Sequence, residues 1–188
     1  QATPTNSEYF GYVVHISKDG STAFIGGAGA SSTGRVFIKE KGAGWANGSE
    51  DSIVTASDGA TFDYFGYAPN SLFVFGGTPI TSNQDGSVLL IGAHGWEGGT
   101  GSSRGAIYYF KKNNGTGLWE QIQIISGQTD AQDFQWFGYS VCTDQDGVKL
   151  IISAQSDDTD GNNAGRAYLY EYDSAAEEYI EQQFFGAD

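Results

Sequence analysis

One short string, Phe-Gly-Tyr, occurs three times in this chain of 188 residues, at 10–12, 65–67 and 137–139. An aromatic residue precedes each copy, and an Asp-Gly pair followed by an apolar run comes after it. A glycine-rich segment then leads to a second apolar run, and a last segment opens with an aromatic residue. So many anchors in the same order indicate three tandem copies of one structural unit.

Each unit is predicted to form four short strands. The Asp-Gly pairs at 19–20, 85–86 and 146–147 are typical of hairpin turns, because glycine adopts a positive φ at little cost. No stretch has the apolar period of a helix. The middle strands are apolar at consecutive positions, which is typical of a sheet covered on both faces. A single unit cannot cover its own faces, so neighbouring units must stack.

The sequence therefore predicts an all-β, β-propeller-like fold of three tandem four-stranded antiparallel blades. We expect one repeat domain over residues 1–188, with units at approximately 1–58, 59–129 and 130–188. The order of anchors resembles the FG-GAP repeat of integrin-α-type β-propellers. The copy around Trp136-Phe137-Gly138-Tyr139 matches it most closely. The resemblance implies propeller blades and is only weakly informative about function.

Three blades do not close a ring, since closed propellers usually have four to eight. The two chain ends are in phase with the repeat, so the units form either a partial propeller or blades completed by neighbouring copies. The expected partners are other copies of this chain or further repeats of a longer one, with head-to-tail addition giving a filament. The chain contains no methionine, which predicts a processed chain or a fragment.

Charge and composition narrow the range of partners. The formal net charge is −14, which repels phosphate backbones and anionic lipid headgroups, so nucleic acid is not an expected partner. No apolar run is long enough to insert into a membrane. Cys142 is the only cysteine, so an internal disulfide is impossible, and its place in a strand predicts a buried thiol.

Calcium is the one cofactor the sequence suggests, and none is certain. Members of the family often carry a calcium loop with alternating aspartates. Here only Asp144 and Asp146 approach that pattern, and a plain β-turn explains them as well. A better set of oxygen ligands stands at alternate positions around a glycine, at Asp158, Asp160 and Asn162. A solvated acidic loop is the competing interpretation of that set.

Three further features are candidate interaction sites. Asn47 and Asn114 begin N-glycosylation sequons, although Asn-Gly is also turn chemistry. Trp96 lies in a glycine-rich loop, where its ring would stack on a sugar. The middle copy carries an insertion, and its apolar residues form either a partner-docking patch or a loop folded back on its own blade: Leu72, Phe73 and Phe75.

No recognisable catalytic motif is present. The chain lacks Gly-x-Ser-x-Gly and phosphate-binding loops, and His15 and His94 have no zinc-ligand spacing. We therefore expect a non-enzymatic extracellular or cell-surface protein with a structural or adhesion role. The alternative is a module that binds glycans or extracellular proteins. A third hypothesis, a glycosidase, requires two converging carboxylates in a cleft.

Overall fold

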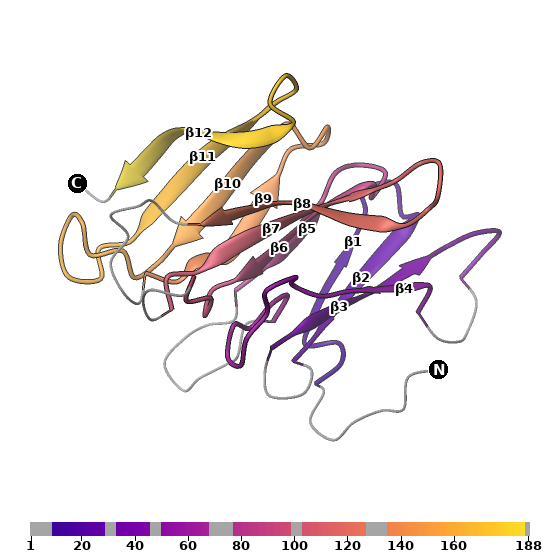
Figure 1. Ribbon diagram of the computed structural model, residues 1–188, viewed down its shortest axis with the longest axis horizontal. Helices are drawn as coiled ribbons and strands as arrows, with labels where there is room; N and C mark the ends of the chain where they lie inside the picture. Colours follow the sequence, from indigo (N-terminus) through magenta and orange to yellow (C-terminus); the bar gives the residue numbers. More distant parts are fainter. Residues whose placement is uncertain are drawn as a thin grey trace.

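The computed structural model describes residues 9–28, 33–45, 50–67, 77–98, 103–126 and 135–186. Within these ranges it contains twelve strands and no helix. The strands form three four-stranded antiparallel sheets, called here blades 1, 2 and 3, which stand in a row with blade 1 nearest the N-terminus (Figure 1). The predicted all-β fold of three tandem blades is thus confirmed.

Each blade is a meander in which consecutive strands pair. Blade 1 contains β1 (Val13–Ile16), β2 (Thr22–Gly27), β3 (Arg35–Glu40) and β4 (Ser52–Val54). Blade 2 contains β5 (Ile80–Ser82), β6 (Val88–Ala93), β7 (Ala106–Lys112) and β8 (Trp119–Ser126). Blade 3 contains β9 (Phe137–Thr143), β10 (Lys149–Ala154), β11 (Arg166–Asp173) and β12 (Glu178–Gly186). The strands of each blade fall within one predicted unit, while the unit boundaries themselves stay a prediction.

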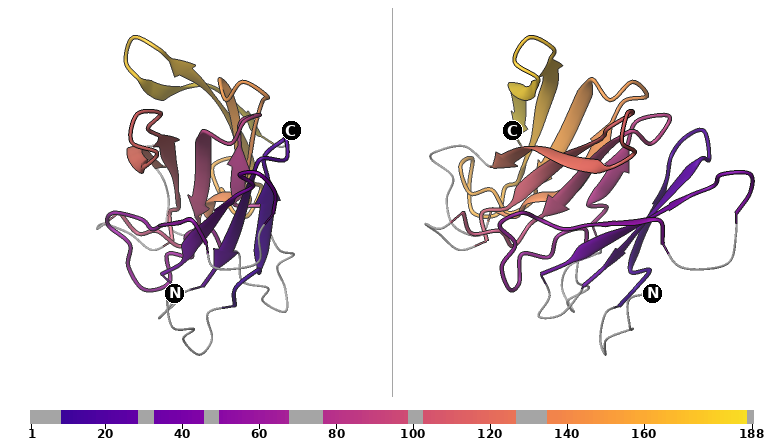
Figure 2. Two further views of the ribbon diagram at one scale, coloured as in Figure 1. Left: turned by 90° about the vertical axis from the view of Figure 1, so that its right-hand side faces the viewer. Right: turned by 45° about the vertical axis from the view of Figure 1, so that its right-hand side comes forward.

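The first and last strands lie on opposite sides of the row. Figure 2 shows β1, β5 and β9 along one side and β4, β8 and β12 along the other. The turns that contain the Asp-Gly pairs, between the first and second strands, are hydrogen-bonded from each blade to the next. The N–H of Asp19 donates to the carbonyl of Gln84 over 3.0 Å, and the N–H of Gln84 donates to that of Gln145 over 2.8 Å.

The predicted turn chemistry is confirmed at the Asp-Gly pairs, where Gly20, Gly86 and Gly147 have φ values of 70°, 70° and 71°. It is wrong in detail at Asn114-Gly115. In that turn the positive φ belongs to Gly117, at 72°. The side chain of Asn113 instead accepts the N–H groups of Gly115 and Thr116 and shapes the turn.

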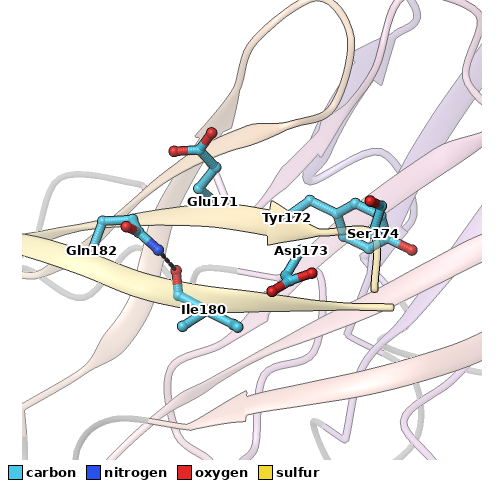
Figure 3. A pocket seen from close by; sticks show the side chains of 6 residues that line it. All are labelled: Glu171, Tyr172, Asp173, Ser174, Ile180 and Gln182. Atoms are coloured by element: carbon cyan, nitrogen blue, oxygen red, sulfur yellow. Dashed lines mark hydrogen bonds between the residues drawn. The ribbon is translucent and has the colours of Figure 1, made fainter. Parts of the chain in front are cut away.

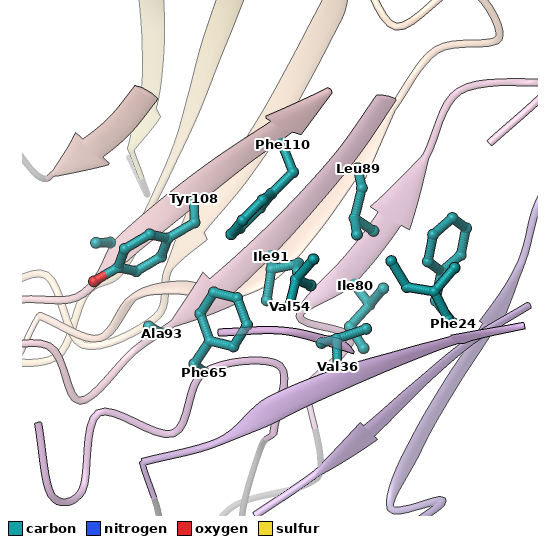
Figure 4. Close-up of a cluster of buried hydrophobic side chains, with 12 residues drawn as sticks. Phe24, Val36, Val54, Phe65, Ile80, Leu89, Ile91, Ala93, Tyr108 and Phe110 are labelled. Atoms are coloured by element: carbon teal, nitrogen blue, oxygen red, sulfur yellow. The ribbon is translucent and has the colours of Figure 1, made fainter. Parts of the chain in front are cut away.

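Two apolar cores fill the spaces between the blades. The first lies between blades 1 and 2, where Figure 4 shows side chains of both sheets meeting. The second lies between blades 2 and 3. Consecutive residues of β6 point alternately into the two cores, and Leu89, Leu90 and Ile91 are all fully buried. The consecutive apolar pattern therefore reflects a sheet covered on both faces, as predicted. Among the described residues, no helix is long and apolar enough to span a bilayer.

Candidate functional site

Each blade begins with a corner formed by aromatic-Phe-Gly-Tyr, at residues 9–12, 64–67 and 136–139. In all three, the N–H of the tyrosine donates to the carbonyl of the first aromatic residue, over 3.1, 3.0 and 3.2 Å. The glycine has a φ of 85°, 65° or 84°, as the third residue of a type II turn requires. The first aromatic residue also has a positive φ, which is rare for a bulky side chain. The three copies therefore share one backbone shape.

Two of these corners dock onto the preceding blade, and we call each such contact a joint. At the first joint, the N–H of Phe65 donates to the carbonyl of Thr33 over 3.1 Å. At the second, the N–H of Phe137 donates to the carbonyl of Arg104 over 3.0 Å. Both phenylalanine rings are buried and contact a tyrosine of their own third strand edge to face, Phe65 with Tyr108 at 5.2 Å between ring centroids.

Glycines on the preceding blade make the joints sterically feasible. A Cβ on Gly34 would lie 2.1 Å from the carbonyl oxygen of Phe65, and one on Gly105 would lie 2.0 Å from that of Phe137. Both glycines also have positive φ, at 89° and 87°. The obstructing atoms belong to the backbone and cannot rotate away, so any side chain here would force the blades apart.

A second pair of glycines, at the ends of the second strands, performs the same role. A Cβ on Gly26 would lie 2.1 Å from the carbonyl oxygen of Gly66, and one on Gly92 would lie 1.9 Å from that of Gly138. Each joint thus closes on two glycines of the preceding blade. We call the four positions seats: Gly26 and Gly34 at the first joint, Gly92 and Gly105 at the second.

The first blade presents an open surface, defined by Phe10, Val14, Ile16 and Ile53 and called here the N-terminal end face. Pairing registers place Val14, Ile80 and Val141 at the same position of the three first strands. Val14 is 69% exposed, whereas Ile80 and Val141 are each 4% exposed. Phe10 is 62% exposed, against 0% for Phe65 and 1% for Phe137. The residues themselves are similar, and the difference in exposure arises because no described blade packs against this face of blade 1.

The third blade is open on its opposite surface, the C-terminal end face, defined by Cys142, Ile151 and Phe185. Registers place Phe24, Leu90 and Ile151 at one position of the second strands. The first two are fully buried and Ile151 is 49% exposed. Each fully buried aliphatic or aromatic side chain contributes about 1.5–3 kcal/mol. The two end faces therefore expose apolar side chains at the positions that are buried at the internal joints.

The prediction that the Cys142 thiol is buried is wrong. The sequence predicts a buried thiol, but the side chain is exposed. Its counterpart in blade 1, His15, instead contacts the next blade, with Nε2 at 3.0 Å from the Ser82 hydroxyl. Thr81, the counterpart in blade 2, is buried. A strand residue at this position is covered only where another blade follows.

The better calcium candidate is engaged by protein groups. Asp160 receives two hydrogen bonds from the Arg166 guanidinium, each of 2.8 Å. Asp158 accepts the N–H of Asn163, and Asn162 accepts the Asn163 side-chain amide. Arg166 also lies over the Phe184 ring, 4.4 Å from its centroid. Nothing described brings three His, Cys, Asp or Glu side chains together as metal ligands. Calcium binding here stays a prediction.

The other acidic candidates act in turns. Asp144 accepts the N–H groups of Val148 and Lys149 over 2.8 and 3.1 Å, which closes the hairpin that also contains Asp146. Near the outer end of blade 3, an open depression contains two carboxylates, and Figure 3 shows its lining: Glu171, Tyr172, Asp173, Ser174, Ile180 and Gln182. Asp173 accepts the N–H groups of Ala175 and Ala176, so it stabilises its own turn.

The remaining candidates are placed as follows. Trp96 is half-buried against the first core, and its indole N–H donates to Asp58 over 3.0 Å. Asn114 and Thr116 are exposed in the turn between β7 and β8, where an oligosaccharide would have room. Asn47 and the insertion residues lie outside the described residues: Leu72, Phe73 and Phe75. No sugar-binding role for Trp96 follows from its contacts.

Sequence reasoning missed a row of aromatic rings that crosses all three blades. The last tyrosines of the first two corners, Tyr12 and Tyr67, meet edge to face at 4.6 Å. Tyr64 stacks on His94 at 5.0 Å, and His94 meets Tyr139 edge to face at 5.1 Å. His94 is buried, and its Nδ1 has no hydrogen-bond partner among the described residues. Burial lowers the pKa of His94 to about 4.

This burial predicts a loss of stability in mild acid. Unfolded His94 binds a proton near pH 6.5, whereas the folded form resists protonation until about pH 4, so the free energy of unfolding should fall as the pH drops between these values. His15, whose pKa is also lowered by burial, acts in the same direction, and Asp63, whose pKa is raised by burial, opposes it. Denaturant unfolding of the chain and of His94→Phe checks this. The variant should show a flatter pH dependence, and an unchanged slope would contradict the assignment.

Comparisons with known proteins agree with this architecture. Residues 119–170 match the family model of the FG-GAP repeat. This stretch runs from β8 into β11 and so includes the corner of the second joint, residues 136–139, but not its seats Gly92 and Gly105. A search among curated proteins found no match.

Two solved structures resemble this chain to different degrees. A protein from Lactobacillus plantarum has a TM-score of 0.53 and 21% identity, over 93% of this chain and 42% of that one. A functionally unknown protein from Desulfotomaculum acetoxidans has a TM-score of 0.42 and 12% identity, over 94% of this chain and 56% of that one. The chain thus spans less than two thirds of either protein, and the first likeness speaks for the fold alone. Residues 119–170 match the FG-GAP repeat, and the fold that contains them is an all-β, β-propeller-like stack of three blades.

Proposed function

We propose that this chain is a non-enzymatic structural or adhesion module, located outside the cell or at its surface, whose two end faces are covered by further blades. One observation carries the proposal. Positions that are buried at both internal joints are exposed only where a blade has no neighbour, as Val14 and Ile151 are. Apolar positions that recur in every copy and lack cover at the ends favour additional blades on both sides.

The additional blades come from further repeats of a longer chain or from other copies of this one. Copies added head to tail would extend the row into a filament. An extracellular location is supported by the FG-GAP repeat, whose relatives are typically extracellular, and by the exposed sequon at Asn114. Glycans or extracellular proteins are the further partners that such a location would bring.

Hydroxyl-radical footprinting tests the covering of the end faces. The natural protein, purified from its source, is compared with the isolated chain of 188 residues. We expect Val14 and Ile151 to be oxidised in the isolated chain and protected in the natural protein. Equal oxidation in both would refute the proposal. Enzymatic deglycosylation of the natural protein, with a shift in mass at the Asn114 peptide, would test the secretory location separately.

A further inference from the structure

The two internal joints define what a blade must offer in order to receive a corner. It needs a glycine at the end of its second strand and a glycine before its third strand, because backbone oxygens of the incoming corner lie about 2 Å from where Cβ atoms would be. Pairing registers identify the corresponding positions on blade 3. Gly26 pairs with Val36 and Gly92 with Ile107, and on blade 3 Ser153 pairs with Ala167.

Blade 3 has glycine at the seat before its third strand but serine at the seat in its second strand. Gly165 corresponds to Gly34 and Gly105, and it keeps their positive φ, at 75°. The second-strand seat is Ser153. Its side chain is fixed in place by β9, since its hydroxyl accepts the N–H of Ser140 over 2.9 Å and donates to the carbonyl of Ser140 over 3.3 Å. This side chain therefore lies where a fourth corner would bring a glycine carbonyl.

The obstruction is large compared with the tolerance of such contacts. A Cβ at Gly92 would be 1.9 Å from the Gly138 oxygen, and contacts between a Cβ and a backbone oxygen essentially never fall below 3.0 Å. An incoming corner would have to shift by more than 1 Å away from Ser153. That shift would stretch the neighbouring hydrogen bond, which is 3.1 and 3.0 Å long at the internal joints.

A joint between two copies of this chain would also need a docking corner, and blade 1 provides one. The corner at residues 9–12 has the same turn as the two docked corners, and a Cβ built on its Gly11 would have no heavy atom within 4 Å. Phe10 stands exposed beside it. Of the two seats on the receiving blade, the second-strand seat is the one that has changed.

We propose that Ser153 is a specificity-determining residue that prevents blade 3 from receiving the Phe10-Gly11-Tyr12 corner of a second copy. The inference rests on the proposed function, because it assumes that end faces are covered by blades. The inference narrows the partners that fit the N-terminal end face. Such a partner is a repeat blade that carries glycine at both seats. Of the two sources of blades proposed above, this favours further repeats of a longer chain over copies of this chain added head to tail in the joint geometry.

Sedimentation velocity over a wide concentration range tests the proposal with four chains. The wild type should stay unassociated through this joint, and Ser153→Gly should associate at least about tenfold more tightly. Ser153→Ala should behave as the wild type, since the Cβ alone blocks the seat. Ser153→Gly combined with Phe10→Ala should lose the gained association, because its corner no longer fills the joint.

Three results would overturn the proposal. They are association of the wild type that Phe10→Ala abolishes, Ser153→Ala matching Ser153→Gly, or no association of a Ser153→Gly chain that melts cooperatively. A further readout needs no change at residue 153: Phe10→Ala in the wild-type background should leave sedimentation unchanged. If Ser153→Gly fails to associate while Val14 and Ile151 are protected in the natural protein, only this inference fails. If they are oxidised there, the proposed function fails.

Discussion

Replacing Phe137 by alanine should lower the free energy of unfolding by about 3–5 kcal/mol, whereas the same change at Phe10 should cost about 1 kcal/mol or less. Phe137 is buried at the second joint, where its ring contacts Tyr168 at 5.5 Å and Tyr170 at 6.3 Å. Alanine would leave a cavity between two sheets that cannot collapse freely. Phe10 contacts Phe37 at 4.9 Å but is mostly exposed, so alanine removes little buried surface.

Urea unfolding followed by circular dichroism measures this difference directly. Phe65→Ala is the matched control, because Phe65 occupies the equivalent place at the first joint and should resemble Phe137. Similar losses at all three positions would mean that the ring stabilises its own blade alone, and that the joint contributes little.

Replacing Gly92 by alanine should lower the free energy of unfolding by about 3 kcal/mol. The added Cβ would lie 1.9 Å from the Gly138 carbonyl oxygen, so blade 3 would have to move away from blade 2. No positive φ contributes at this residue, and the loss therefore reports the steric effect. Overpacking of this kind is relieved only by backbone shifts that open the second core.

Gly44→Ala provides the control for the loss of glycine itself. Gly44 has no heavy atom within 4 Å of the added Cβ and no positive φ, so alanine should be neutral or stabilise by up to about 1 kcal/mol. Thermal unfolding of both variants gives the comparison. If Gly92→Ala were as mild as Gly44→Ala, the close approach of the two backbones would not constrain the joint.

The repeat made much of the fold predictable. Its Phe-Gly-Tyr copies are local signals that marked the repeated units, and its Asp-Gly pairs each predicted a turn that the structure contains. Consecutive apolar residues such as Leu89, Leu90 and Ile91 predicted a sheet covered on both sides, because alternation in a strand sends neighbours to opposite faces.

The joints were less predictable because they depend on contacts between residues far apart in the chain. Nothing near Gly26 or Gly92 in the sequence shows that a carbonyl of another blade approaches there. Burial depends on neighbours in the same way. The strand around Cys142 resembles the others and so predicts a buried thiol, yet the side chain is exposed because no described blade follows. The sequence places Trp96 in an open loop, but Asp58 holds it against the first core.

The rate at which a thiol on one first strand reacts with a maleimide tests the central claim, that a blade face is closed only by the next blade. Cys142 is compared with a cysteine placed at the matching position of blade 2, in the double variant Thr81→Cys, Cys142→Ser. In the folded chain, Cys142 should be labelled almost as fast as in urea, whereas the thiol introduced at position 81 should be labelled only as fast as the chain unfolds. Equal rates at the two positions would contradict the account.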